Sequence, residues 1–148
     1  MKSARLLVLS MLLLSAAGIA QALEFKSVGA APAVLYDAPS AKGRKVFIAP
    51  RGMPVEVVLT YGEWTKVRDA AGDLAWVDSR LLSTRRNVIV SAANARVREA
   101  ASDASAIAFT ADKGVLLELV EPAAGGWVKV RHRDGQGGFV RASEVWGE

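Results

Sequence analysis

The chain has no cysteine and only one histidine among its 148 residues. Disulfide bonds and a lipid-modified N-terminal cysteine are therefore excluded, and a zinc site made of two or three Cys or His ligands lacks its parts. Nucleophilic Ser-His or Cys-His catalysis would have to rely on His132, which falls in a predicted turn, where we expect an exposed structural residue. We predict that the protein uses neither a metal nor another cofactor.

Long blocks of basic residues are also missing. The formal net charge is +4, and it falls to +2 once residues 1–22 are set aside, because they carry two basic and no acidic side chains. The pair Arg85-Arg86 is typical of a solvated linker, whereas a protein that follows a phosphate backbone carries longer basic segments. Nucleic acid is therefore not an expected partner.

The N-terminus alone is apolar enough to enter a membrane. Lys2 and Arg5 precede an apolar run at residues 6–20, and small residues follow at Ala20 and Ala22. This order is typical of a secretory signal peptide, and the alternative of a retained anchor is weaker because about 15 apolar residues fall short of the ~20 that span a bilayer. We predict that residues 1–22 are a signal peptide and that the product is secreted or periplasmic, with no membrane insertion after cleavage.

The main feature that is present is a repeat. Residues 62–68, Gly-Glu-Trp-Thr-Lys-Val-Arg, return as residues 125–131, Gly-Gly-Trp-Val-Lys-Val-Arg, and at this offset seven of the 21 positions from Gly62 to Leu82 are identical. A period near 60 residues exceeds that of solenoid repeats and suits a small module used twice. We predict two domains, residues 23–83 and 88–148, joined by a short polar linker that restricts their relative motion.

Each copy contains short strand patterns separated by turn residues. In order along the chain they lie at residues 55–61, 64–68, 74–77, 115–121, 127–131 and 138–140. The alanine-rich residues 91–108 would be a helix by propensity alone, but residues 96–102 within them align with residues 34–40, where Pro39 prevents a continuing helix. We therefore predict a strand and an irregular loop there, and an all-β protein.

Aromatic side chains supply the signal for a binding site. Side chains alternate faces along a strand, so an inward Val67 places Trp64 outward among basic residues, and the second copy places Trp127 outward in the same way. Trp76 and Phe139 likewise lie opposite to neighbouring valines. Exposed aromatic groups rimmed by polar residues often mark binding sites. The alternative is that these rings pack over an open barrel end or against the neighbouring repeat.

These elements together resemble the bacterial Src-homology-3-like domain family, often written SH3b. The resemblance rests on the Gly-x-Trp-x-Lys-Val-Arg motif, the turn glycine and the (Ala/Gly)-(Trp/Phe)-Val segment, all found twice. Residues 94–98, Asn-Ala-Arg-Val-Arg, also look like the opening strand of that family. The resemblance implies a five-stranded, partly open β-barrel for each copy, no catalysis, and a role in binding cell-wall peptides or in targeting.

The resemblance also implies where a ligand groove would lie. Asp78 and Leu81 stand where the eukaryotic groove for proline helices has a proline and a tyrosine, which argues against polyproline ligands. Arg98 stands at the tyrosine position of the second copy. Carried over by position, the groove residues are Tyr36, Trp64 and Trp76 in the first copy and Trp127 and Phe139 in the second.

The function predicted from these observations is binding without catalysis. We expect two tandem SH3-like barrels that recognise an extended peptide, with the stem peptides of cell-wall peptidoglycan as the favoured ligand. The alternative is a periplasmic scaffold or protein–protein interaction subunit with no cell-wall ligand. A carboxylate hydrolase would need two acids facing each other across a cleft, and a barrel of ~60 residues has little interior in which to raise a carboxyl pKa.

Overall fold

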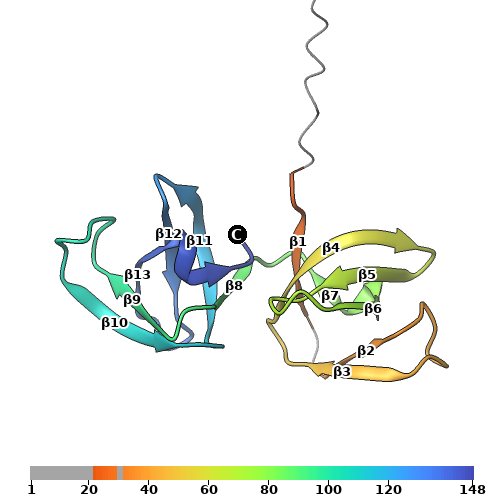
Figure 1. Cartoon of the computed structure of the whole chain (residues 1–148). Coiled ribbons are helices and arrows are strands. Elements are labelled where there is room, and N and C mark those ends of the chain that lie inside the picture. The colour runs from red at the N-terminus through yellow and green to blue at the C-terminus, as the bar shows by residue number, and fades with distance from the viewer. Residues whose placement is uncertain (1–21, 30–31) are drawn as a thin grey trace, which may run out of the picture.

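The computed structural model describes residues 22–29 and 32–148, so residues 1–21 of the predicted signal peptide lie outside the described residues. Two β-units follow one another along the chain (Figure 1). We call residues 25–83 unit one and residues 87–146 unit two. In the described part of the chain, no helix has the length and apolar character needed to span a bilayer.

The two units contain the same elements in the same order. Unit one consists of β1 Phe25–Val28, β2 Ala33–Tyr36, β3 Lys45–Ala49, β4 Pro54–Tyr61, β5 Trp64–Arg68, β6 Leu74–Asp78, the 3-10 turn η1 Ser79–Leu81, and β7 Leu82–Ser83. Unit two consists of β8 Asn87–Val90, β9 Asn94–Arg98, β10 Ile107–Asp112, β11 Leu116–Ala124, β12 Trp127–Arg131, β13 Gly137–Arg141, η2 Ala142–Glu144 and β14 Val145–Trp146. The repeat read from the sequence is therefore a repeat of whole folding units.

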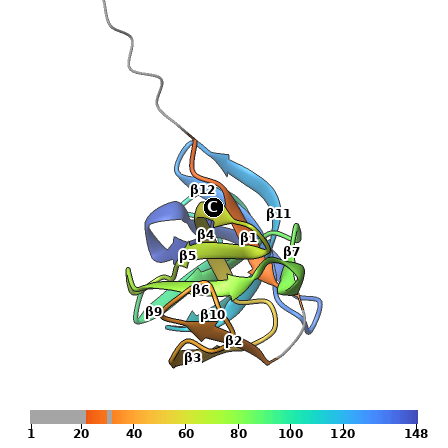
Figure 2. The same ribbon diagram turned by 90° about the vertical axis from the view of Figure 1, so that its right-hand side faces the viewer.

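Each unit is one antiparallel sheet that curls around its own interior. The strand order is β3-β2-β6-β5-β4-β1-β7 in unit one and β10-β9-β13-β12-β11-β8-β14 in unit two. The register shifts between Val57 and Leu59 where β4 meets β5, and between Leu119 and Glu121 where β11 meets β12. Such bulges increase strand twist and let a short sheet bend over a core. Figure 2 shows the bent sheet of unit one from its outer end.

The interiors are small and aliphatic. The hydrophobic core cluster of unit one consists of Val28, Ala33, Leu35, Ala49, Met53, Val55, Val67, Ala75 and Val77. The core cluster of unit two consists of Val88, Val90, Ala95, Val97, Ala111, Leu117, Val128, Val130, Val140 and Val145. Because the two clusters are separate, each copy of the repeat folds around its own core.

The backbone conformation explains why the repeated motif begins with glycine. Gly62 and Gly125 have φ values of 57° and 59°, in the left-handed region that side chains disfavour. In unit one, Gly62 lies in the two-residue connection between the paired Tyr61 and Trp64, so the glycine lets β4 return as β5. The turn is thus encoded locally in both copies.

Three features compare directly with the sequence-based expectations. The alanine-rich segment forms β9, an irregular loop and the start of β10. This confirms the strand and loop predicted from its alignment with the segment that contains Pro39. Each sheet has two strands beyond the expected five, because β1 and β7, and likewise β8 and β14, pair with each other at one edge. The strand expected at residues 115–121 extends further, since β11 continues to Ala124 with irregular pairing to β12 before the turn at Gly125 and Gly126.

The junction between the units is partly aromatic. Phe25 of β1 packs edge-to-face against Trp146 of β14, with ring centroids 5.1 Å apart and an interplanar angle of 85°. The guanidinium of Arg86, in the connection between the units, lies 5.5 Å from the centroid of the Phe25 ring and donates to the Gly147 carbonyl at 3.0 Å. These contacts join the first strand of unit one to the last strand of unit two.

Two hydrogen bonds add to this junction. Asn87 Nδ2 donates to the Gly52 carbonyl at 3.0 Å, and Ser27 Oγ donates to the Arg85 carbonyl at 2.8 Å. Phe25 and Asn87 occupy equivalent positions, since the backbone bonds of β1 and β8 repeat at an offset of 62. The same position in each unit is therefore used to contact the other unit.

Candidate functional site

Strand β5 places Trp64 on the outer face of unit one. Thr65 and Val67 are only 3% and 1% exposed, whereas Trp64 and Lys66 are half-buried and Arg68 is exposed. Side chains on a strand alternate between faces, so the inward Thr65 and Val67 fix the outward direction of Trp64. The alternation predicted for this strand is confirmed.

Three of the predicted aromatic residues, Tyr36, Trp64 and Trp76, come together on this outer face, and we call them the aromatic cluster. The Tyr36 ring meets the Trp64 ring edge-to-face, with centroids 5.6 Å apart and an interplanar angle of 88°. Tyr36 is also the direct cross-strand partner of Trp76. All three are half-buried, so packing holds the rings while part of each remains open to solvent.

Charged groups flank the aromatic cluster. Lys66 Nζ lies 5.9 Å from the centroid of the Trp76 ring, and Asp78 is the cross-strand partner of Trp64. Asp78 Oδ2 accepts from Arg80 Nη2 at 2.7 Å and Asp78 Oδ1 accepts from Arg80 Nε at 3.1 Å. These side-chain bonds, with the backbone N–H of Arg80, hold the pKa of Asp78 below its ordinary value. The carboxylate therefore stays ionised and tied to Arg80 at neutral pH.

The equivalent face of unit two is built differently. Trp127 is 8% exposed, because the guanidinium of Arg141 lies 4.3 Å from the centroid of its ring. Arg141 is the cross-strand partner of Trp127, the position that Asp78 occupies opposite Trp64 in unit one. A cation–π contact of this kind stabilises the pair and covers the ring.

A polar hollow of about 440 Å³ lies beside Arg141. Its lining residues are Asn94, Arg96, Arg98, Asp103, Arg141 and Glu144. Arg141 pairs with Asp103, and Arg98 Nη1 donates to the Ser105 carbonyl at 2.8 Å. Two of the three arginines of this hollow are therefore already held by neighbouring groups of unit two.

The five predicted site residues thus divide between the units. Tyr36, Trp64 and Trp76 form the aromatic cluster, whereas Phe139 is half-buried beside Lys129, whose Nζ lies 5.8 Å from its ring centroid. The exposed position expected for Trp127 is wrong, because Arg141 covers the ring. Sequence reasoning missed Arg141, although its cross-strand position opposite Trp127 offered a signal.

The alternative that the predicted rings pack between the repeats is not what the junction shows. The aromatic contact at the junction is made by Phe25 and Trp146, while Trp64 contacts Tyr36 and Trp127 contacts Arg141. The ring contacts of Trp64 and Trp127 therefore lie within their own units.

Histidine and its neighbours form a local turn structure. His132 Nδ1 lies 3.1 Å from Asp134 Oδ2, and the backbone N–H of Gln136 is the main reason that the pKa of Asp134 is held below its ordinary value. The His132 side chain is 27% exposed, so the residue sits in the predicted turn but is less open than expected. Among the described residues, no group of three or more His, Cys, Asp or Glu side chains is placed to hold a metal ion.

Several of the carboxylates are bound to cations. Asp37 Oδ2 lies 3.5 Å from Arg44 Nε, and Glu118 Oε2 lies 2.9 Å from Arg131 Nη2. The Asp69 carboxylate accepts from the backbone N–H groups of its own turn. These contacts are typical of structural acids that stabilise turns and strand pairs.

A comparison with protein-family models matches residues 29–84 and 91–147 to the bacterial SH3 domain. The chain belongs to the bacterial SH3 domain family. The two matches fall on units one and two, which are hereafter the first and second SH3 domains, and the predicted fold of tandem SH3-like domains is confirmed.

Solved structures similar to this chain include larger proteins. NlpC2 from Trichomonas vaginalis is 11% identical with a TM-score of 0.39, and the match covers 86% of this chain and 49% of that one. NlpC1 from the same organism is 13% identical with a TM-score of 0.41, over 93% and 50% of the two chains. An NlpC/P60 family protein from Bacillus cereus is 16% identical with a TM-score of 0.38, over 83% and 56%. The chain thus spans about half the length of these structures, and a comparison with curated proteins gave no match.

The first SH3 domain also shows what occupies the two positions that depart from the eukaryotic groove. Leu81 packs against the buried core, and Asp78 is bonded to Arg80. The proline and tyrosine rings that would clamp a proline helix are therefore replaced by a core side chain and an ion pair.

Proposed function

We propose that this protein is an exported, non-catalytic binding module that recognises extended peptides, with the stem peptides of peptidoglycan as its ligand class. The observation that carries the proposal is the aromatic cluster of the first SH3 domain. There, Tyr36 and Trp64 form an edge-to-face pair beside Trp76, and each ring keeps part of its surface in contact with solvent. Membership of the bacterial SH3 domain family supports a binding role, because such domains often recognise cell-wall peptides.

The cluster has the physical properties that an extended peptide requires. Aromatic faces gain binding free energy from small apolar side chains and from peptide groups without demanding one ligand shape. Lys66 places positive charge beside the rings, which suits a peptide with free carboxylates. The rings are packed before the ligand arrives, so little side-chain entropy is lost on binding.

The second SH3 domain contributes less through its aromatic residues. Arg141 covers Trp127, and Arg98 stands where the first domain has Tyr36. We assign the principal peptide site to the first domain. The second domain adds affinity only where a polymeric ligand reaches both domains at once.

Export and the lack of catalysis are parts of the same proposal. Residues 1–22 have the charge, apolar run and small residues of a signal peptide, which supports a secreted or periplasmic location. Asp37, Asp78 and Glu118 are engaged with arginines, which supports structural rather than catalytic roles for these acids.

Co-sedimentation with purified peptidoglycan tests the proposal, using the chain from residue 23 onward. Trp64→Ala removes the centre of the aromatic cluster, and we expect the bound fraction at limiting peptidoglycan to fall at least about fivefold, the effect of losing ~1 kcal/mol of ring contact. The control is Val120→Ala, since Val120 is 41% exposed and lies in β11 of the second domain, away from the cluster. We expect this control to sediment like the wild type.

The outcome that contradicts the proposal is a folded Trp64→Ala protein that sediments as well as the wild type. Circular dichroism and the melting temperature show whether each variant is folded. A Tyr36→Ala variant repeats the test on a neighbouring ring, so that a folding defect in one variant leaves the other informative.

A protein partner is the second candidate function, and one surface feature favours it. Val46, Phe47 and Ile48 of the edge strand β3 are 42%, 46% and 62% exposed. Apolar side chains on an edge strand often mark a contact with another chain. Failure of the wild-type protein to sediment with peptidoglycan would favour this scaffold role over the cell-wall ligand.

A further inference from the structure

An open cleft separates the two SH3 domains and is distinct from the aromatic cluster. Its volume is about 940 Å³, within the range of ligand sites in proteins. Its walls come from β1, the turn before β4, the connection between the domains, β11, and the turn after β12. No residue of the aromatic cluster lines it.

The cleft gathers the positive charge of the protein. Arg51, Arg85, Arg131 and Arg133 line it, and Glu118 is the one acid among its lining residues. From residue 23 onward the chain has 17 basic and 15 acidic side chains, and without these five residues it has 13 basic and 14 acidic. The net positive charge of this part of the chain therefore lies at the cleft.

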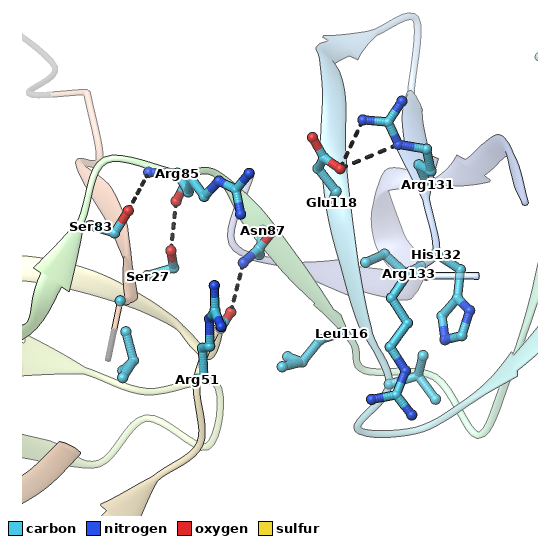
Figure 3. A pocket seen from close by; sticks show the side chains of 15 residues that line it. Ser27, Arg51, Ser83, Arg85, Asn87, Leu116, Glu118, Arg131, His132 and Arg133 are labelled. Carbon is cyan, nitrogen blue, oxygen red and sulfur yellow. Dashed lines mark hydrogen bonds and ion pairs between the residues drawn. The ribbon is translucent and has the colours of Figure 1, made fainter. Parts of the chain in front are cut away.

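Three of the four arginines are not engaged by a carboxylate. Glu118 is paired with Arg131 at 2.9 Å, and none of the ion pairs among the described residues involves Arg51, Arg85 or Arg133. All three are exposed. Figure 3 shows Arg51 and Arg85 on the side of the first domain and Arg133 on the side of the second, with Leu116 between them in this view.

The two walls are bonded to each other, so the backbone segments that carry the arginines are held relative to one another. Asn87 Nδ2 donates to the Gly52 carbonyl across the junction at 3.0 Å. Gly52 has a φ of 84°, and a Cβ there would lie 3.2 Å from Asn87 Nδ2, so glycine permits this close approach. A cleft with fixed walls loses less conformational entropy when a ligand binds.

Arg133, on the second domain's side of the cleft, is a property of that domain's turn and not of the repeated fold. Residues 131–135 read Arg-His-Arg-Asp-Gly, whereas the equivalent residues 68–72 of the first domain read Arg-Asp-Ala-Ala-Gly. The fold tolerates alanine at the position of Arg133. The turn that faces the cleft carries the extra arginine, and the equivalent turn that does not line the cleft lacks it.

We infer that this cleft binds an acidic peptide, whose carboxylates pair with Arg51, Arg85 and Arg133 while Leu116 contacts apolar side chains between them. Guanidinium groups bind carboxylates through paired, charge-assisted hydrogen bonds. The combination of arginines with an apolar residue suits a peptide of mixed side chains. The lining has no Phe, Tyr or Trp on which nucleic-acid bases would stack.

Isothermal titration calorimetry with two capped pentapeptides tests the inference. The acidic probe is Glu-Leu-Glu-Leu-Glu and its neutral match is Gln-Leu-Gln-Leu-Gln, each titrated at low salt into the chain from residue 23 onward. We expect the acidic peptide to bind and to weaken as sodium chloride is added, because salt screens exposed charges. Equal binding of the two peptides would overturn the inference, as would no binding of either.

Paired charge variants locate the site. Arg51→Gln combined with Arg133→Gln should weaken the acidic peptide at least about tenfold, because two charge-assisted contacts are lost. The control is Arg44→Gln combined with Arg96→Gln, which removes the same charge from two exposed arginines outside the cleft. We expect a change of less than about twofold for the control. Equal weakening by both double variants would show that overall charge, and not the cleft, governs binding.

Two further measurements distinguish a peptide site in the cleft from a phosphate site and from binding at the aromatic cluster. Tripolyphosphate that binds more tightly than the acidic peptide, and loses affinity in Arg51→Gln with Arg133→Gln, would make the cleft a phosphate site and overturn the peptide assignment. Trp64→Ala should leave the affinity for the acidic peptide unchanged, so failure of the aromatic cluster to bind peptidoglycan leaves the test of the cleft intact.

Discussion

Trp64 and Trp127 occupy the same position of the repeat, but Trp64 is half-buried whereas Trp127 is buried and only 8% exposed. The difference comes from the residue across the strand, which is Asp78 opposite Trp64 and Arg141 opposite Trp127. Asp78 turns to Arg80, whereas Arg141 lies over the indole. The comparison shows that one cross-strand neighbour decides whether the repeated tryptophan ring stays accessible or is covered by another side chain.

The two domains also differ at the position of Ala75. Ala75 is buried in the first domain, and the equivalent residue of the second domain is Gly138. A Cβ at Gly138 would overlap the Arg98 carbonyl oxygen and lie 2.9 Å from Val97 Cγ1. Strand β9 therefore approaches β13 so closely that only glycine fits at position 138. Arg98 lies on β9, the strand that makes this close approach.

The largest expected effect separates the two tryptophans by stability. Trp127→Ala should lower the free energy of unfolding by about 3 kcal/mol, as for other large-to-small changes at buried sites, and Trp64→Ala should cost less because Trp64 is only half-buried. Urea denaturation followed by circular dichroism measures both. Equal losses would contradict the different environments described for the two rings.

The next effect tests the close strand contact of the second domain. Gly138→Ala should lower the free energy of unfolding by about 2 kcal/mol through overpacking, because the methyl group meets backbone atoms that cannot move aside easily. The matched variant, Ala75→Gly in the first domain, should cost about 1 kcal/mol or less, from added unfolded-state freedom. Thermal unfolding of both variants makes the measurement, and a Gly138→Ala protein as stable as the wild type would refute the tight approach.

Exchanging the cross-strand residue should convert one site toward the other. Asp78→Arg places a guanidinium opposite Trp64, and we expect peptidoglycan co-sedimentation to fall about two- to fivefold, the equivalent of ~0.5–1 kcal/mol of cation–π contact. Asp78→Asn is the control, since it removes the carboxylate without adding a cation. A drop of the same size in both variants would show that the carboxylate, and not a cover over Trp64, controls binding.

The smallest expected effect is a pH dependence. The bonds from Arg80 lower the pKa of Asp78 from its ordinary value of 3.8, so the folded state favours the ionised form. This contribution to stability is present above pH 3.8 and is lost as the pH falls through the lower folded-state pKa. The melting temperature of Asp78→Asn should therefore fall less than that of the wild type when the pH is lowered below 3.8.

Thr60→Ala serves as the control for the pH experiment, because Thr60 is exposed and carries no ionisable group. Its acid-induced loss of stability should follow that of the wild type. An acid limb that is identical in Asp78→Asn and wild type would rule out a contribution from the Asp78–Arg80 pair.

The sequence predicted best what neighbouring residues decide among themselves. The hairpin of β4 and β5, the left-handed Gly62 between them and the inward Val67 all follow from local patterns. It predicted less well the strands whose pairing is distant in the chain, such as β1 with β7, because short segments carry little periodicity and are stabilised by partners about 55 residues away. Tyr36, Trp64 and Trp76 were predicted by position, but their contact geometry was not.

From its own residues, the sequence determined that one small β-fold is used twice, since turn glycines and alternating valines act over a few residues and recur with the motif. The tertiary structure alone decided that Arg141 covers Trp127, that Phe25 meets Trp146, and that arginines at positions 51, 85 and 133 share one cleft. The physical reason is distance along the chain. Each of these arrangements joins side chains that no local pattern connects, and only the folded sheets bring them within contact or onto facing walls.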